Sequence, residues 1–191
     1  MHNTQSAQLS DNTQEYLIRY CEILKKMICD MENAETTNSI SHNFIVQMIP
    51  HHEAAIEMSR NLLRFTTYIP LQCLANDIIS DQIQGIEQMK EMLDCCSKCE
   101  NKDSSLCLYE RKNRQITKAM FSKMENITET NSINLNFICQ MLPHHKGAVK
   151  MAQNALRFDI CDSLHEILES IIFTQKRQIK QMEYLYQVLA N

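Results

Sequence analysis

The chain has 191 residues, 44% of them hydrophobic and only two of them glycine, so it can bury a full core but has few tight turns. Its net charge of −4 gives no electrostatic reason to expect nucleic acid or an anionic membrane as a partner, and no stretch approaches the roughly 20 apolar residues of a membrane span. The polar N-terminus lacks the basic and apolar segments of an export signal, which predicts a cytoplasmic protein.

Helical periodicity predicts three helices in the first part of the chain. The first covers about 11–32, with apolar side chains every three or four positions and Ser10 or Asp11 as its cap. A polar connector over 33–38 precedes a second helix, which begins near Ile40 and continues to about Phe65. A third begins at Pro70, because proline suits a first helical turn, and continues to about 94.

The second part of the chain repeats this plan at about 105–126, 132–158 and 163–190. Residues 13–98 and 106–191 align without a gap, and 32 of the 86 aligned positions are identical. We therefore predict an all-α fold, an antiparallel helical bundle built from two tandem three-helix repeats over 11–94 and 106–191. A polar tail over 1–10 and a cysteine-containing linker over 95–105 complete the predicted organisation.

Two adjacent histidines follow a mid-helix proline in each half. Proline removes an amide donor and bends a helix, so the two bends indicate either a built site or a helix curving around its core. Adjacent helical residues point about 100° apart, so each histidine needs ligands from elsewhere, and imidazole with thioether sulfur suits Cu(I) or another soft transition metal. The predicted metal ligands are Met48, His51, His52 and Met58 in the first half and Met141, His144, His145 and Met151 in the second.

Methionine and glutamine add to this pattern. Ten of the twelve methionines form five pairs 93 residues apart, whereas leucine matches at only two positions, which favours a role for sulfur. The alternative is that the methionines only fill the core, because isoleucine also matches well between the halves and methionine stripes at helical spacing are typical of flexible core filling. Gln82 and Gln175 interrupt apolar stripes at equivalent positions. Their amides either hydrogen-bond the imidazoles and fix the tautomers, or lie at partly exposed stripe edges.

The sequence carries no catalytic motif. The Glu-x-x-His motif of di-iron sites does not occur in the sequence, and Gly-rich phosphate loops and nucleophile elbows are also absent. The nine cysteines do not recur between the halves, which indicates reduced thiols rather than a disulfide framework. The alternative for the linker cysteines is a second soft-metal site formed by Cys95, Cys96, Cys99 and Cys107.

Both halves carry one extended motif, which in the first half is Phe44-x-x-x-Met48-x-Pro50-His51-His52-x-x-Ala55-x-x-Met58 and then Gln82-x-x-x-Ile86-x-x-Met89. On this motif the chain resembles the DUF305 family, a domain of unknown function. The resemblance implies a ferritin-like bundle, and it implies copper ligation by the motif histidines and methionines, because the family includes exported copper-binding proteins. The chain departs from the family in lacking an export signal and in having Gly85 and Gln178 where glutamate is usual.

We therefore predict a non-enzymatic bundle that binds Cu(I) or another soft transition metal as its partner, with homo-oligomerisation through helix faces left open. The first alternative is a structural or protein-interaction bundle without metal, in which buried histidines only satisfy hydrogen bonds with Gln82 and Gln175. The second alternative, a di-iron ferritin-like enzyme, is disfavoured by the absence of Glu-x-x-His.

Overall fold

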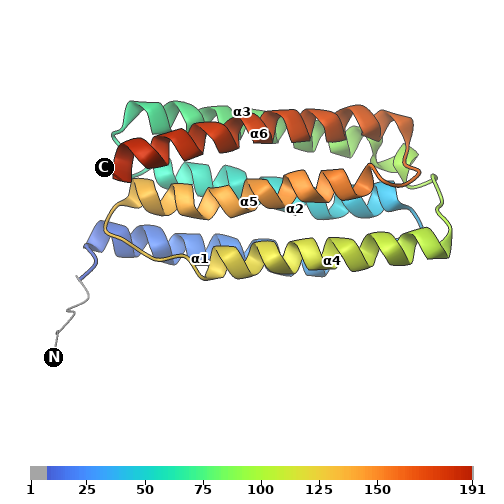
Figure 1. The fold of residues 1–191 in the computed structure, drawn as a ribbon, viewed down its shortest axis with the longest axis horizontal. Helices are drawn as coiled ribbons and strands as arrows, with labels where there is room; N and C mark the ends of the chain where they lie inside the picture. The colour runs from blue at the N-terminus through green and yellow to red at the C-terminus, as the bar shows by residue number, and fades with distance from the viewer. Residues whose placement is uncertain (1–7, 191) are drawn as a thin grey trace.

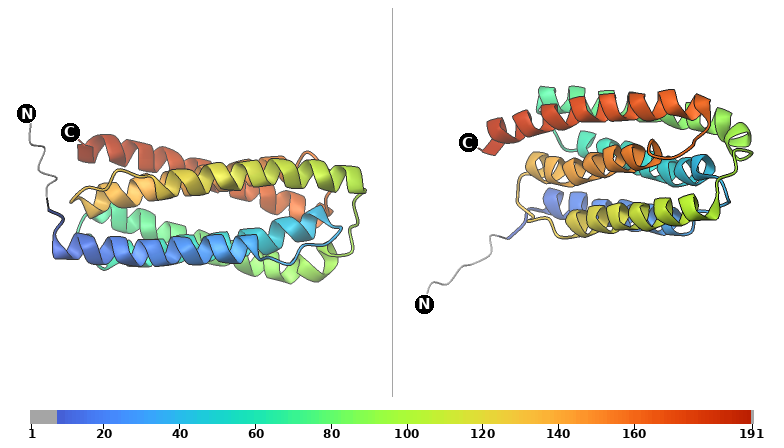
Figure 2. Two further views of the ribbon diagram at one scale, coloured as in Figure 1. Left: turned by 90° about the horizontal axis from the view of Figure 1, so that it is seen from below. Right: turned by 45° about the vertical axis from the view of Figure 1, so that its right-hand side comes forward.

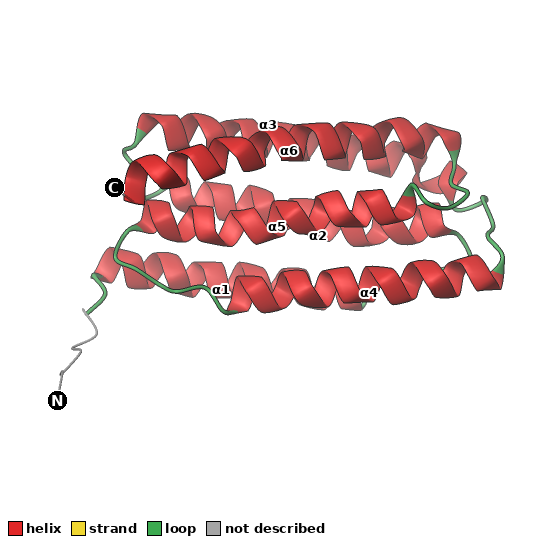
Figure 3. Cartoon of the chain, in the orientation of Figure 1, coloured by secondary structure: helices red, strands yellow, loops and turns green. Residues whose placement is uncertain are grey.

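The computed structural model describes residues 8–190, which form six α-helices joined by short connections (Figure 1). No strand occurs in this part of the chain, so the all-α prediction is confirmed (Figure 3). Residues 1–7 of the predicted polar tail lie outside the described residues. The helices are α1 (Asp11–Glu32), α2 (Ile40–Leu63), α3 (Ile69–Cys96), α4 (Asp103–Glu125), α5 (Ile133–Ala155) and α6 (Asp162–Ala190).

The helices stack in three layers of two, and each layer pairs equivalent helices of the two halves. The helices α2 and α5 form the middle layer, with α3 and α6 on one side and α1 and α4 on the other (Figures 1 and 2). Contacts join α2 to α5 and α3 to α6, so the halves share one core. The middle layer is therefore covered by helices on both sides.

Local sequence explains where the helices begin. The side chains of Ser10, Ser39 and Ser132 each accept a hydrogen bond from the amide three residues later, which satisfies a donor that a helix start leaves free. Pro70 lies in the first turn of α3, where its missing amide costs nothing. Pro50 and Pro143 lie inside α2 and α5, and both helices continue through them.

Methionine contributes strongly to the core. All ten methionines that match between the halves are at most 3% exposed, and most of them are completely buried. The helices approach closely where Gly147 of α5 meets Met120 of α4, since a Cβ added to Gly147 would lie 2.1 Å from the Met120 sulfur. The small residue thus sets the α4–α5 distance.

The connection between α3 and α4 covers only residues 97–102 and is anchored by hydrogen bonds. Asn101 donates its backbone amide to the Asn38 carbonyl (2.8 Å) and its side-chain amide to the Asp159 carbonyl (2.6 Å). Cys95 and Cys96 therefore belong to the last turn of α3, and Cys107 lies within α4. None of the described helices combines the length and apolarity that crossing a membrane requires.

Candidate metal centre

Four histidines meet in the middle layer of the bundle. His51 and His52 come from α2, His144 and His145 come from α5, and each is at most 1% exposed. The rings of His51 and His144 stack across the boundary between the halves, with centroids 3.6 Å apart and planes inclined by 28°. The other two rings lie 6.1 Å from His51 and 5.7 Å from His144 respectively. The fold thus gathers both predicted histidine pairs into one cluster.

Hydrogen bonds fix the tautomers of the two histidines on α5. His144 Nε2 lies 3.0 Å from the backbone carbonyl oxygen of His51, which can only accept, so Nε2 carries the proton and donates it. A mid-helix proline leaves the carbonyl four residues before it without its usual donor. The acceptor of His144 is the His51 carbonyl, which is not one of these carbonyls. The Nδ1 atom of His144 is therefore left with a lone pair.

His145 is held by a chain of polar groups from both halves. Its Nε2 lies 2.8 Å from Gln178 Oε1 on α6, and Gln178 Nε2 donates to Asp81 Oδ2 on α3 at 3.0 Å. Because the Asp81 carboxylate accepts, the Gln178 amide must present its oxygen to His145, which in turn donates from Nε2. Arg177 also contacts Asp81, at 3.2 Å. The lone pair of His145 is thereby placed on Nδ1.

Buried imidazole nitrogens without a hydrogen bond of ordinary geometry are concentrated in this cluster. They include both ring nitrogens of His51, whose ring also lies near the His144 backbone, and the Nδ1 atoms of His52, His144 and His145. Burial is the main cause that lowers the pKa of His52 to about 3 and the pKa of His145 to about 4. Burial likewise lowers the pKa of His51 and of His144 well below 6.5. The rings are therefore neutral near pH 7, as metal ligation requires.

His52 lies in different surroundings from His145. The residue facing it is Gly85, whose added Cβ would lie 3.1 Å from His52 Cδ2 and 3.2 Å from Nε2. A cavity of about 80 Å³ adjoins the ring, and Gln82 and Gln175 line it. Gln82 Oε1 and both side-chain polar atoms of Gln175 have no hydrogen-bond partner. The structure thus places these glutamines beside His52 without an amide-to-imidazole hydrogen bond.

The four predicted methionine ligands lie on the same two helices as the histidines. Met48, Met58, Met141 and Met151 are all at most 1% exposed. Among residues 8–190, no group of three or more His, Cys, Asp or Glu side chains is arranged to hold a metal ion. A metal ion bound in this core would therefore need thioether sulfur in addition to imidazole nitrogen.

Three of the four cysteines of the predicted second site lie near one another, since the Cys96 thiol interacts with Cys95 and Cys99. Cys95 and Cys107 are exposed, Cys96 is buried and Cys99 is half-buried. The thiols of Cys96 and Cys99 also interact with Cys161, which precedes α6 and was not among the predicted ligands. Burial raises the pKa of Cys161, but hydrogen bonds from Cys96, Ser163 and the amides of residues 163 and 164 lower it to about 7.

Gln178, Gly85 and Asp81 are the site residues that the sequence patterns did not include among the ligands or their supports. The signal that could have identified two of them was the departure from the family motif, since Gly85 and Gln178 occupy the position where glutamate is usual. The structure shows why that position matters, because it faces His52 in one half and His145 in the other. Asp81 had no sequence signal, since its counterpart in the second half is Thr174.

The helical fold agrees with comparisons to known proteins. The family model for "Domain of unknown function (DUF305)" matches residues 23–93 and 41–186. The chain belongs to the DUF305 family. A DUF305 fragment from Deinococcus radiodurans has a similar fold, with a TM-score of 0.58 and 21% identity over 78% of this chain and 95% of that one. No match was found among curated proteins.

Structures of a protein called CopM are also similar to this member of the DUF305 family. The silver-bound form of CopM is 29% identical, with a TM-score of 0.58 over 79% of this chain and 97% of that chain. The Cu(II)-bound form is 27% identical, with a TM-score of 0.60 over 78% of this chain and 97% of that chain. These all-α structures match the bundle described above.

Proposed function

We propose that this DUF305 protein is a non-enzymatic metal-binding protein that holds a soft ion, Cu(I) in the first place, among its four central histidines and the neighbouring methionines. The observation that carries the proposal is the set of buried imidazole nitrogens without partners. A buried polar atom without a hydrogen bond is costly, and a bound ion is one of the few groups that would compensate it.

The inferred tautomers support the same proposal. His144 and His145 both donate from Nε2, so both keep a lone pair on Nδ1. Histidines that bind metals usually donate their other ring N–H to a carboxylate, a backbone carbonyl or water, as His144 does to the His51 carbonyl. Met48 and Met141 lie three residues before His51 and His144, and their sulfur atoms favour Cu(I) over harder ions. The similar CopM structures were solved with silver and with Cu(II).

The test is an anaerobic titration with Cu(I) in the presence of a coloured Cu(I) chelator that competes for the ion. Wild type is compared with the variant Met48→Leu/Met141→Leu, because leucine keeps the buried volume and removes the sulfur. We expect at least a tenfold loss of affinity, since a metal–thioether bond has no replacement. The matched control is Met27→Leu/Met120→Leu, which changes two equally buried methionines on the outer helices α1 and α4.

The control variant should bind Cu(I) like wild type. If wild type takes up no Cu(I), or if the two variants bind equally, the assignment of the ion to these residues is wrong. A further variant, His144→Gln/His145→Gln, then tests the imidazoles directly, with circular dichroism as the measure of folding. Retained uptake in that variant would also contradict the proposal.

The structural alternative needs the buried histidines to be satisfied by Gln82 and Gln175. The unpartnered atoms of both glutamines and of the imidazoles count against it. The di-iron alternative needs several inward carboxylates. Within the described residues the only carboxylate connected to the cluster by hydrogen bonds is Asp81, through Gln178, which favours the non-enzymatic function.

A further inference from the structure

A long groove runs along the outside of the second half between α4 and α5, with α6 at one edge. Its volume is about 910 Å³. The floor is apolar and includes Ile116, Met120 and Val149, which are all buried. Six exposed cationic side chains and no acidic side chain line it, namely Lys112, Lys123, Lys146, Lys150, Arg157 and Lys176. This basic groove lies in a chain whose net charge is −4.

The first half has an equivalent but smaller groove, of about 320 Å³, between α1 and α2. Each of the residues that line it has a counterpart 93 positions later that lines the basic groove. The charges have changed between the two. Glu22, Asp30, Glu53 and Glu57 in the first groove correspond to Gln115, Lys123, Lys146 and Lys150 in the second. Each acidic residue of the first groove thus has a neutral or basic counterpart in the second groove.

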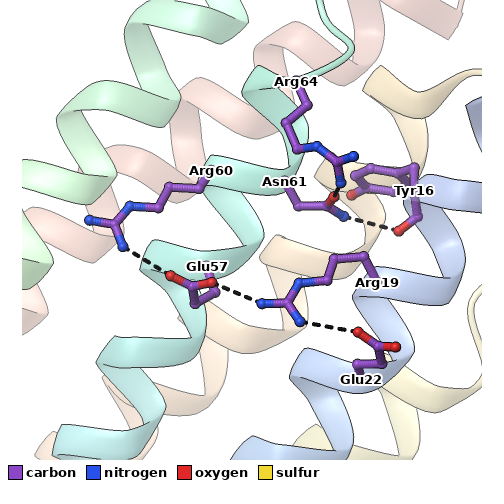
Figure 4. Close-up of polar contacts among 7 residues, drawn as sticks. All are labelled: Tyr16, Arg19, Glu22, Glu57, Arg60, Asn61 and Arg64. Atoms are coloured by element: carbon purple, nitrogen blue, oxygen red, sulfur yellow. Dashed lines mark hydrogen bonds and ion pairs between the residues drawn. The ribbon is translucent and has the colours of Figure 1, made fainter.

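All three cations of the first groove pair with acidic side chains of the same groove (Figure 4). Arg19 pairs with Glu22 and with Glu57, both at 3.1 Å, and Arg60 pairs with Glu57 at 2.9 Å. Lys26 pairs with Asp30 in the same way. No such network exists in the basic groove. Among residues 8–190, its one ion pair joins Lys146 to Glu183 at 2.7 Å, and the other five cations have none.

The cations are spread along the whole length of the basic groove. Because Asn154 donates to the Tyr109 carbonyl and Gly147 meets Met120, α4 and α5 run antiparallel, with Lys112 and Arg157 near one end and Lys123 and Lys146 near the other. From residue 139 to residue 157 the α5 wall measures about 27 Å at 1.5 Å per residue. A ligand that matches this groove must carry negative charge along its length beside an apolar face.

An acidic amphipathic helix fits these requirements better than the other anions. A lipid with one headgroup would satisfy the cations at only one end of the groove. A nucleic acid has charge along its length, but its bases stack on aromatic side chains, and none lines this groove. Helices commonly bind by laying an apolar face into a groove between two other helices.

We propose that the groove between α4 and α5 is a docking site for an acidic amphipathic helix of a partner protein. The apolar face of that helix packs on Ile116, Met120 and Val149, and its acidic flanks pair with the lysines of both walls. The site lies on the outer face of the second half, and none of the predicted metal ligands lines it.

The probe is a fluorescent synthetic helix of about 18 residues, which matches about 27 Å, with leucine at every third or fourth position and glutamate between. Binding is followed by fluorescence anisotropy at low salt. We expect Lys112→Glu/Lys123→Glu/Lys150→Glu to weaken binding at least tenfold. These exposed positions have no ion pair to lose, so the fold should persist. Lys146 is left unchanged because of its pair with Glu183.

The matched control is Lys25→Glu/Lys90→Glu/Lys180→Glu, which makes the same change of net charge at exposed lysines outside the groove. It should bind the probe within about threefold of wild type. Equal losses in both variants, or equal binding of a scrambled peptide of the same composition, would show attraction by net charge alone and overturn the proposal. Tighter binding to phosphatidylserine vesicles than to the helix would overturn it in favour of a lipid.

Discussion

The two histidine pairs have the same sequence and burial but different supports. In the second half, His145 donates to Gln178, which is itself held by Asp81 from the first half. In the first half, His52 faces Gly85 and a small polar cavity, with no partner for its Nδ1 atom. His145 is therefore held in one orientation by hydrogen bonds, whereas His52 has no such support.

The outer grooves of the two halves also differ, in how their charged side chains are paired. In the groove of the first half, Arg19 and Arg60 pair with acidic side chains of the same groove (Figure 4). In the groove of the second half, five of the six cations have no ion pair among residues 8–190, and Lys146 pairs with Glu183. The buried histidines and methionines match between the halves, while the nearby residues Gly85 and Asp81 differ from their counterparts Gln178 and Thr174. The matched histidines thus meet in one cluster whose surroundings differ between the halves.

The largest expected effect concerns the burial that both pairs share. The folded pKa values of His52 and His145, about 3 and about 4, lie below the unfolded value of 6.5, so the unfolded chain binds more protons between these limits. Stability should be complete above about pH 6.5 and fall as the pH decreases toward 4, by up to about 1.4 kcal/mol per pH unit for each neutral histidine. Urea unfolding measured at several pH values tests this.

The control for the pH series is His42→Gln/His165→Gln, which removes two histidines outside the cluster. His42 is half-buried and His165 is exposed, and the variant keeps all four histidines of the cluster, so it should still lose stability as the pH falls below 6.5. A flat profile in wild type between pH 6.5 and 4 would mean that the core imidazoles accept protons in the folded state. The low pKa values given above would then be wrong for both histidine pairs.

The next effect separates the pairs. Gln178→Leu removes the acceptor of His145 and leaves a buried N–H without a partner, so we expect a loss of about 1 to 3 kcal/mol in the free energy of unfolding. The control is Gln175→Leu, one turn earlier on the same helix, whose side-chain polar atoms have no partners to lose. That change should be neutral or stabilising. Equal losses would show that the Gln178 hydrogen bond contributes nothing specific.

A smaller effect is expected on the other pair. Gly85→Ala places a Cβ 3.1 Å from His52, so the ring must shift by a few tenths of an ångström toward the cavity. Overpacking of this size costs about 1 kcal/mol, and the higher helix propensity of alanine offsets much of it. Nitrogen NMR of the imidazoles should show changed His52 signals and unchanged His145 signals. Movement of both sets of signals would mean that the pairs are coupled.

The smallest effect concerns the outer groove of the first half. Glu57→Lys introduces the residue found at position 150 and removes the pairs with Arg19 and Arg60. Since these side chains are 40% or more exposed, the loss should stay below about 1 kcal/mol and shrink at high salt. Lys150→Glu is the reciprocal control and should leave stability within about 0.5 kcal/mol, the usual range for surface changes. A larger loss for Glu57→Lys than for Gln178→Leu would reverse this ranking.

The sequence by itself determined the helices. Apolar residues return every three or four positions, serine caps precede three of the helices, and Pro70 opens α3, so the pattern predicted six helices at nearly their observed bounds. The repeat spacing also identified the histidines and methionines as matched sets, because identity at a fixed offset is visible without coordinates. These features depend on local spacing, which the linear order of residues contains.

Only the tertiary structure decided which residues meet. The stacking of His51 on His144, the chain from Asp81 through Gln178 to His145, and the meeting of Cys96 with Cys161 all join residues more than 30 positions apart. Such contacts depend on how the three layers pack, and the packing is set by the whole buried surface rather than by any one motif. The sequence shows that the charges differ at positions 93 residues apart. Only the structure shows that these positions line equivalent grooves on the two halves.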